Sequence, residues 1–121
     1  MTSPKGHTIR IKRVYLPPEK SDGQRVLVDR LWPRGLSKED AQLTLWLKEV
    51  GPSTDLRKWF GHDPARWAEF RSRYADELKD NSAVATLREL AGKGGLTLLY
   101  SAHDEAHNQA VVLADFLERH R

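Results

Sequence analysis

Two short segments of the chain are apolar with almost no polar alternation. Residues 26–28 read Val-Leu-Val and lie within a strand predicted over residues 25–32, and residues 96–100 read Leu-Thr-Leu-Leu-Tyr. Runs of this kind are typical of strands covered on both faces, as in a parallel sheet. Residues 8–15 instead alternate between isoleucine and basic residues, which predicts a half-exposed strand.

Residues 43–47 alternate leucine with Thr44 and Trp46, which suggests a third strand, although so short a window is also compatible with a helix. Short helices are predicted after the N-cap candidates Ser37 and Ser53 (or Thr54). Gly61 is expected to end the second of these helices.

The second half of the chain has the periodicity of amphipathic helices. In the longest predicted helix, which follows Asp63-Pro64, apolar side chains recur every three or four residues and the opposite face is charged. A last helix is expected from about residue 105 to residue 119, and its apolar segment 110–117 predicts deep burial. The apolar face of the longest helix consists of Trp67, Phe70, Tyr74 and Leu78.

This order of elements predicts the α/β class. We expect a small single-domain sandwich with a mostly parallel central sheet of three to five strands flanked by helices. Residues 1–7 are predicted to be a disordered lead-in, and residues 8–121 are predicted to form the one domain.

The composition removes several function classes. The chain has 121 residues and no cysteine, which excludes disulfides, thiolate catalysis and zinc sites built from cysteine. Its first residues lack the apolar segment of a secretory signal. Because there is also no apolar run of about 18 residues, we expect a cytoplasmic protein with no membrane partner.

Positive charge is concentrated at the start of the chain. Residues 1–38 hold nine Lys or Arg against three Asp or Glu, whereas residues 39–121 hold eleven against fourteen. This skew favours an anionic partner near the first third, such as a phosphate or a nucleic-acid backbone. It is equally compatible with ordinary solvated charges on a strand and its loops.

Charged and aromatic side chains follow the first central strand, where open α/β sheets bind their ligands. Arg30 stands near the strand end, and Arg34 lies in the turn after Pro33. Both are candidate ligand-binding residues, because guanidinium groups bind phosphate at two points. Asp29 is a candidate catalytic base, a group that orients a hydroxyl, or the partner of an arginine in a buried ion pair. Trp32 is a candidate ligand contact within the polar turn.

The loop after the second central strand is the other candidate site. If the two central strands are parallel, this loop faces the same crevice as the first cluster, and the amides of the following helix would favour an anion. Tyr100 is a candidate catalytic residue, and Ser101 and Asp104 are candidate ligand-binding residues. Asp104 is equally an N-cap candidate. Ser101 lacks the nucleophile-elbow pattern, which argues against a serine hydrolase.

A metal site is not expected. His103 and His107 resemble a zinc-protease motif only in their spacing, because Asp104 stands where that motif requires glutamate and His103 is expected to precede the helix. We therefore predict neither a bound metal nor a cofactor.

Several motifs together resemble the YeaO-like family of bacterial proteins (domain of unknown function 488), over nearly the full chain. The motifs are Lys12-Arg13-Val14-Tyr15, Asp22-Gly23, the stretch 25–35 with Asp-Arg-Leu-Trp-Pro-Arg-Gly, Pro52-Ser53, Leu56-Arg57, Trp59-Phe60 and Leu98-Leu99-Tyr100-Ser101-Ala102.

The resemblance implies a small intracellular α/β domain, and it supplies no reaction or catalytic residue. Members often carry Asn-His-Ala at the start of the last helix, where this chain has Asn108-Gln109-Ala110. No general acid–base histidine is therefore expected at Gln109. Asn108 stays a candidate ligand-binding residue.

The leading hypothesis is a cytoplasmic domain that binds or processes a phosphate-bearing, nucleotide-like small molecule at the ends of the central strands. The alternative is a non-catalytic nucleic-acid-binding module that uses the basic N-terminal third, and a protein–protein adaptor is a third reading. Whether the protein is an enzyme, and in what oligomeric state it exists, stay open at this level.

Overall fold

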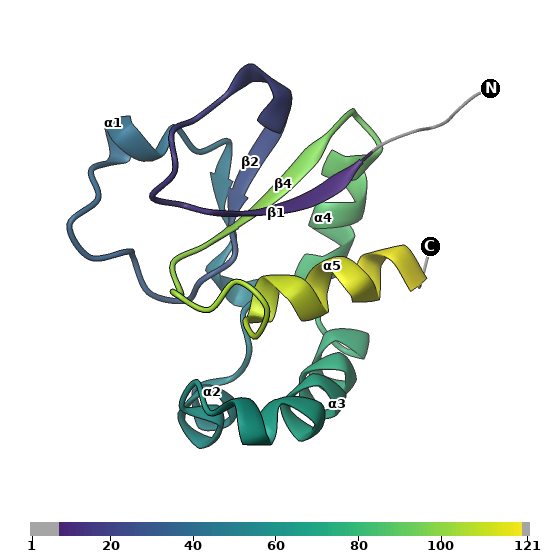
Figure 1. The fold of residues 1–121 in the computed structure, drawn as a ribbon. Helices are drawn as coiled ribbons and strands as arrows, with labels where there is room; N and C mark the ends of the chain where they lie inside the picture. The colour runs from purple at the N-terminus through teal and green to yellow at the C-terminus, as the bar shows by residue number, and fades with distance from the viewer. Residues whose placement is uncertain (1–7, 120–121) are drawn as a thin grey trace.

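The computed structural model describes residues 8–119 and contains a four-stranded, entirely parallel sheet within them (Figure 1). The strands lie in the order β1-β4-β2-β3, so the two apolar runs occupy the centre, as predicted. The half-exposed strand β1 lies at one edge. The strands are β1 (Ile9–Arg13), β2 (Gln24–Leu27), β3 (Leu45–Trp46) and β4 (Leu96–Tyr100).

Helices cover the sheet, which confirms the predicted α/β class. The lead-in predicted over residues 1–7 lies outside the described residues. The helices are α1 (Lys38–Ala41), α2 (Thr54–Phe60), α3 (Trp67–Lys79), α4 (Ala83–Ala91) and α5 (Gln109–Arg119), with 3₁₀ turns at Lys20–Asp22, Lys48–Val50 and Pro64–Arg66.

The two faces of the sheet pack against different cores. Val26 and Val28 of the β2 segment face the larger core, which is filled by side chains from α2, α3, α4 and α5. Leu27 points to the opposite face, where it forms a small second core with Val14 and Leu99, against which Trp32 and Trp46 pack. Because residues 26–28 have apolar neighbours on both faces of the sheet, the lack of polar alternation in this run is explained.

Strand β2 ends at Leu27, five residues before the predicted end at Trp32. The amide of Val28 still donates to the Leu99 carbonyl at 3.1 Å, but the Asp29 carbonyl accepts a bond from the Trp46 indole at 2.8 Å. The indole of Trp46 thus donates where the next backbone amide of the sheet would, and the chain leaves the sheet at this point.

Helix α5 begins at Gln109, later than the predicted start near residue 105. The Asp104 carboxylate accepts bonds from the amides of Ala106 and His107, which closes a separate turn. The side-chain oxygen of Asn108 then accepts a bond from the Val111 amide at 3.2 Å. Asn108 therefore caps the helix, and Asp104 caps the turn before it.

Candidate functional site

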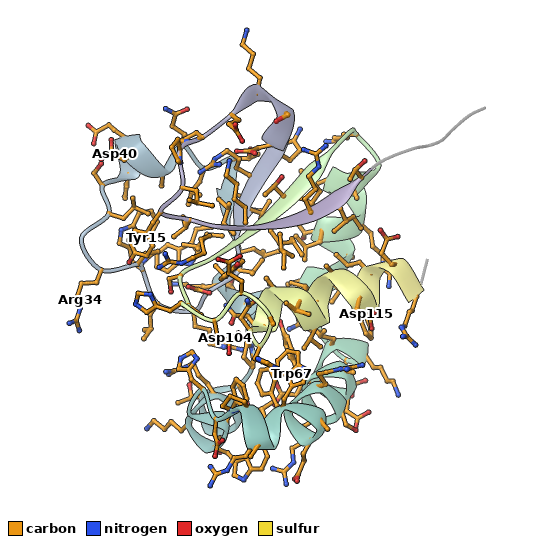
Figure 2. All side chains as sticks on the ribbon, viewed as in Figure 1. Tyr15, Arg34, Asp40, Trp67, Asp104 and Asp115 are labelled. Atoms are coloured by element: carbon orange, nitrogen blue, oxygen red, sulfur yellow. The ribbon has the colours of Figure 1, made fainter. Side chains whose placement is uncertain are left out.

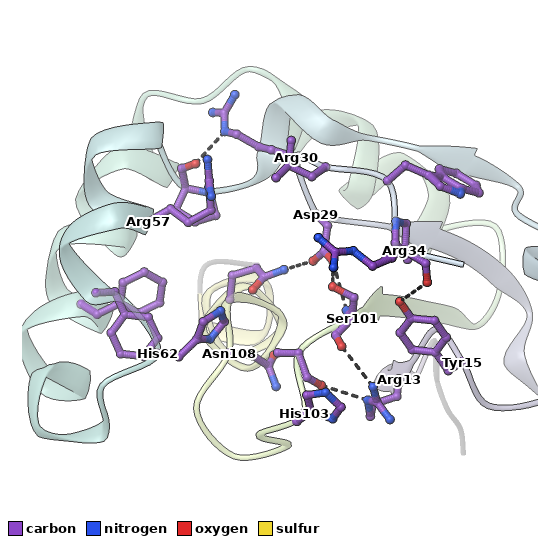
Figure 3. A pocket seen from close by; sticks show the side chains of 18 residues that line it. Arg13, Tyr15, Asp29, Arg30, Arg34, Arg57, His62, Ser101, His103 and Asn108 are labelled. Atoms are coloured by element: carbon purple, nitrogen blue, oxygen red, sulfur yellow. Dashed lines mark hydrogen bonds between the residues drawn. The ribbon is translucent and has the colours of Figure 1, made fainter. Parts of the chain in front are cut away.

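A pocket of about 660 Å³ opens at the carboxyl edge of the sheet, where the sequence places the site (Figure 3). Its walls come from the end of β1 and the loop after it, the loops after β2 and β4, the start of α5, helix α2 with the residues next to it, and helix α3. The lining residues are Arg13, Tyr15, Asp29, Arg30, Leu31, Trp32, Pro33, Arg34, Pro52, Arg57, Phe60, His62, Phe70, Ser101, Ala102, His103, Asn108 and Gln109.

Asp29 follows strand β2 at this edge, and its carboxylate reaches Ser101 in the loop after the neighbouring strand β4. The residue is 9% exposed. One oxygen of its carboxylate accepts two bonds from Ser101, from the amide at 3.0 Å and from the hydroxyl at 2.6 Å. The other oxygen accepts a bond from the side-chain amide of Gln109. Ser101 and Gln109 come from the β4 loop and from α5, so Asp29 joins three segments that are distant in the sequence.

All three donors to Asp29 are uncharged. Within the described residues no ion pair joins its carboxylate to an arginine, so the buried pair that the sequence left open is not formed. Burial is the largest influence and raises the pKa of Asp29 above its ordinary value of 3.8, although the bonds from Ser101 and Gln109 oppose the increase. A buried carboxylate without a cation in a pocket is a common feature of functional sites.

Replacing Asp29 by asparagine is therefore expected to raise the free energy of unfolding at pH 7. Because the folded-state pKa is raised, the contribution of Asp29 to stability is fully present below about 3.8 and is lost as pH rises through the folded pKa. Asp29→Asn keeps the shape of the side chain, and Gln109 can accept a bond after its amide turns over. Urea denaturation between pH 3.5 and 7.5 should show that the free energy of unfolding of Asp29→Asn increases relative to that of the wild type as pH rises.

The matched control is Asp76→Asn, since the side chain of Asp76 is 73% exposed on α3. It should follow the pH dependence of the wild type closely. If the free energy of unfolding of Asp29→Asn changed with pH as that of the wild type does, ionising the buried carboxylate would carry no cost in stability, and this prediction would be wrong.

Arg30 and Arg34, the two arginines expected to bind an anion, both line the pocket. Two donors of the Arg30 guanidinium are already used, because its Nε donates to the Pro52 carbonyl at 2.6 Å and its Nη2 donates to the Gly51 carbonyl at 3.0 Å. Arg34 is exposed and extends away from the fold at the mouth of the pocket (Figure 2). Its carbonyl accepts a bond from the Tyr15 hydroxyl at 2.8 Å, which fixes the turn.

Two further arginines, which the sequence reasoning did not select, also line the pocket. Arg13, at the end of β1, donates to the carbonyls of Ser101 and Ala102 and lies 5.0 Å from the centre of the Tyr15 ring. Arg57, on α2, has a buried Nε with no hydrogen-bond acceptor among the described residues. Ligands bind at the carboxyl edge of a parallel sheet, and this rule, applied to β1, could have identified Arg13. Arg57 was noted only as part of a family motif, and its local sequence does not indicate that it lines a pocket.

His62 enters the pocket through an uncommon backbone conformation. Gly61 and His62 are both left-handed, with φ of 54° and 58°, and together they reverse the chain after α2. This region is uncommon for a residue with a side chain. Such a strained position is often found at binding sites.

Trp32 and Ser101, two of the candidate ligand-binding residues, both line the pocket. Trp32 is also part of the second core, because its ring meets Trp46 edge-on with centres 5.3 Å apart. Its indole nitrogen donates to the Leu36 carbonyl at 2.7 Å. The Ser101 hydroxyl is committed to Asp29.

Asn108 also lines the pocket, but Tyr100 and Asp104 are not among the lining residues. Tyr100 is 3% exposed, and burial raises the pKa of its hydroxyl despite an opposing bond with Asn108. The Asp104 carboxylate is occupied by its own turn and by Nδ1 of His107 at 2.9 Å. The structure therefore brings six of the eight predicted site residues together: Asp29, Arg30, Trp32, Arg34, Ser101 and Asn108.

No group of three or more His, Asp or Glu suited to a metal ion exists within residues 8–119. His107 faces Trp67 edge-on, with ring centres 5.1 Å apart, and does not share a site with His103. None of the described helices is long and apolar enough to cross a membrane.

Comparison with known proteins assigns the chain to a family. A family model described as the inactive DUF488-N3 subclade matches residues 8–121. The uncharacterised protein YeaO of Escherichia coli is 51% identical over 110 residues, which are 90% of this chain and 96% of that protein. The uncharacterised protein Rv3073c of Mycobacterium tuberculosis is 46% identical over 109 residues, which are 90% and 92% of the two chains. No solved structure matches the chain significantly. The chain belongs to the DUF488 family of YeaO-like proteins, within its inactive DUF488-N3 subclade.

Proposed function

We propose that the pocket binds a small phosphate-bearing, nucleotide-like molecule without converting it. The observation that carries this proposal is the charge of the lining, in which four arginines stand against one carboxylate: Arg13, Arg30, Arg34, Arg57 and Asp29. Guanidinium groups bind phosphate through two parallel hydrogen bonds. A concave site with an excess of positive charge also concentrates anions.

The size and the aromatic lining support a ligand larger than phosphate alone. A volume of about 660 Å³ lies within the usual range for small-molecule sites, roughly 300–1,000 Å³. Tyr15 and Trp32 both line the pocket, and their rings offer flat surfaces for a base. Tyr15 is 41% exposed, so a ligand can reach its ring.

The polar groups favour binding over conversion. Asp29 already accepts three hydrogen bonds, and one of them comes from Gln109, an amide that does not exchange protons near neutral pH. A general base takes up a proton and gives it up again, and the hydroxyl and amide groups that contact Asp29 do not titrate near neutral pH to relay one. The match to a subclade described as inactive agrees with a binding role.

The alternative, a nucleic-acid-binding module, is less well supported by the contacts of the basic first third. Lys12 and Arg25 are paired with Asp22, and Arg13 and Arg30 donate to backbone carbonyls. Lys12 and Arg25 are thereby neutralised, and Arg13 and Arg30 line the pocket and not an open basic surface. Binding through many phosphates would fall steeply with salt, whereas a single pocketed phosphate would depend on salt much less.

A thermal-shift screen of nucleotides and phosphosugars tests the proposal. A ligand present at about one hundred times its dissociation constant should stabilise the fold by about 2.7 kcal/mol. For a domain of this size the melting temperature should increase by roughly 10 °C. Arg34→Ala should reduce this response and cost about 0.5 kcal/mol or less of stability, because Arg34 is exposed.

The matched control is Arg71→Ala, which removes an exposed arginine on α3 outside the pocket. It should leave the ligand response unchanged. If no phosphate-bearing compound shifts the melting temperature, or if Arg34→Ala and Arg71→Ala respond alike, the proposed binding site is wrong.

A further inference from the structure

Among the arginines that line the pocket, Arg57 has a buried donor that lacks an acceptor. Its Nε is the one buried side-chain nitrogen or oxygen without a partner within residues 8–119. Arg13 and Arg30 each donate two bonds to backbone carbonyls, and Arg34 extends into solvent. A buried N–H without an acceptor is costly, so such a group calls for a partner from outside the chain, such as a water molecule, an ion or a ligand.

Asp29 offers the complementary feature on the same pocket. A carboxylate has about four acceptor sites, and Asp29 uses two on one oxygen and one on the other. The second oxygen, which Gln109 contacts, retains a site for one more donor. Asp29 thus presents an acceptor to the ligand, in a pocket whose other charged residues are donors.

The donor that suits Asp29 is a neutral hydroxyl. An ammonium group would also bind a carboxylate, but it would enter a pocket that already holds four arginines and would be repelled by them. A hydroxyl adds a hydrogen bond without adding charge. Ser101 already provides one such bond, since its hydroxyl donates to Asp29 at 2.6 Å.

From these two features we infer that the pocket selects a sugar phosphate, with Arg57 binding the phosphate and Asp29 accepting a bond from the hydroxyl group at carbon 2 of the sugar. The inference rests on the proposed function and narrows the ligand to the sugar-phosphate part of a nucleotide or to a free sugar phosphate. Phe60 and Phe70, which line the pocket with Arg57, provide an apolar wall for the carbon skeleton between the two groups.

Calorimetric titration with three probes tests the inference: inorganic phosphate, 2-deoxyribose 5-phosphate and ribose 5-phosphate. Ribose 5-phosphate should bind at least tenfold more tightly than inorganic phosphate. It should also bind about tenfold more tightly than the 2-deoxy compound, because a hydrogen bond to a charged group changes affinity by about this factor or more.

Two variants assign the residues. Arg57→Met should weaken both sugar phosphates by tenfold or more, and Arg71→Met, at an exposed position on α3, should leave both affinities unchanged. Asp29→Asn should bring the ratio between the ribose and deoxyribose compounds close to one while phosphate binding persists. Circular dichroism and the melting temperature of each variant confirm that it is folded.

The outcomes separate this inference from the proposed function. Equal affinity for ribose and deoxyribose compounds, or unchanged binding by Arg57→Met, would overturn the inference and leave phosphate binding in place. Tighter binding of an amino-phosphate such as phosphoethanolamine would show that Asp29 takes a cation and would also overturn it. If neither these compounds nor any nucleotide binds, the proposed function fails as well.

Discussion

Asp22→Asn is expected to lower the free energy of unfolding by about 3–5 kcal/mol, the usual cost of removing one partner from a buried ion pair. Asp22 is 4% exposed and Arg25 is 5% exposed. Oxygen Oδ2 of Asp22 lies 2.5 Å from Nη1 of Arg25 and 3.0 Å from Nζ of Lys12. Without the carboxylate, two cations would face each other in a site with little water.

The surrounding contacts make relaxation difficult. The guanidinium of Arg25 also donates to the carbonyls of Ala41 and Gln42, and the Thr97 hydroxyl donates to the Asp22 carbonyl at 2.6 Å. Arg25 therefore connects β2 to the end of α1, while Thr97 connects β4 to the turn that holds Asp22.

Chemical denaturation of Asp22→Asn and of the double variant Asp22→Asn/Arg25→Met tests the ion pair. Removing both charges should recover part of the loss, because the double variant leaves fewer buried cations unpaired. A loss below 1 kcal/mol for Asp22→Asn would show that the pair contributes no more than a surface one.

The same carboxylate predicts a loss of stability in acid. Burial raises the pKa of Asp22, but the bonds from the Glu19 amide, Lys12 and Arg25 outweigh it, so the net pKa is lowered from 3.8. A group with a lowered folded-state pKa stabilises the protein above its unfolded value and loses that contribution as pH falls through the folded value. Wild-type stability should therefore decrease below about pH 4 more steeply than that of Asp22→Asn.

Phe70→Ala is the second change with a large expected effect, a loss of about 3–5 kcal/mol. Phe70 is 2% exposed and lies at the centre of an aromatic row on α3, between Trp67 and Tyr74. Its ring stacks on Phe60 of α2 with centres 4.3 Å apart. The substitution would remove a buried aromatic contact between the two helices and would leave a cavity at the wall of the pocket.

Trp59→Ala is the matched control for Phe70→Ala. Trp59 also joins α2 to α3, but it is only half-buried, and the guanidiniums of Arg66 and Arg73 cover its ring. Solvent can fill the space it leaves, so its loss should be clearly smaller. Equal losses in urea denaturation would show that the contacts of Trp59 with Arg66 and Arg73 stabilise the protein as much as the buried stack of Phe60 and Phe70 does.

The sequence by itself was enough to predict most of the strands and helices and the edge of the sheet at which the pocket opens. Apolar runs marked the two central strands, and the caps Ser37, Ser53 and Gly61 act as predicted in the structure. These signals work because a cap or a periodic face involves groups within about one turn of the chain. The position of Asp29 at the end of a central parallel strand was enough to place it at the pocket.

Only the tertiary structure decided which groups meet there. Asp29 is bound by Ser101 and Gln109, which follow it by 72 and 80 residues. Arg57 enters the pocket from a helix on which it differs in no local respect from other polar residues. The reason is that a long side chain takes its direction from the carbonyls, rings and cavities around it, and these come from segments whose spatial order, β1-β4-β2-β3, no periodicity encodes.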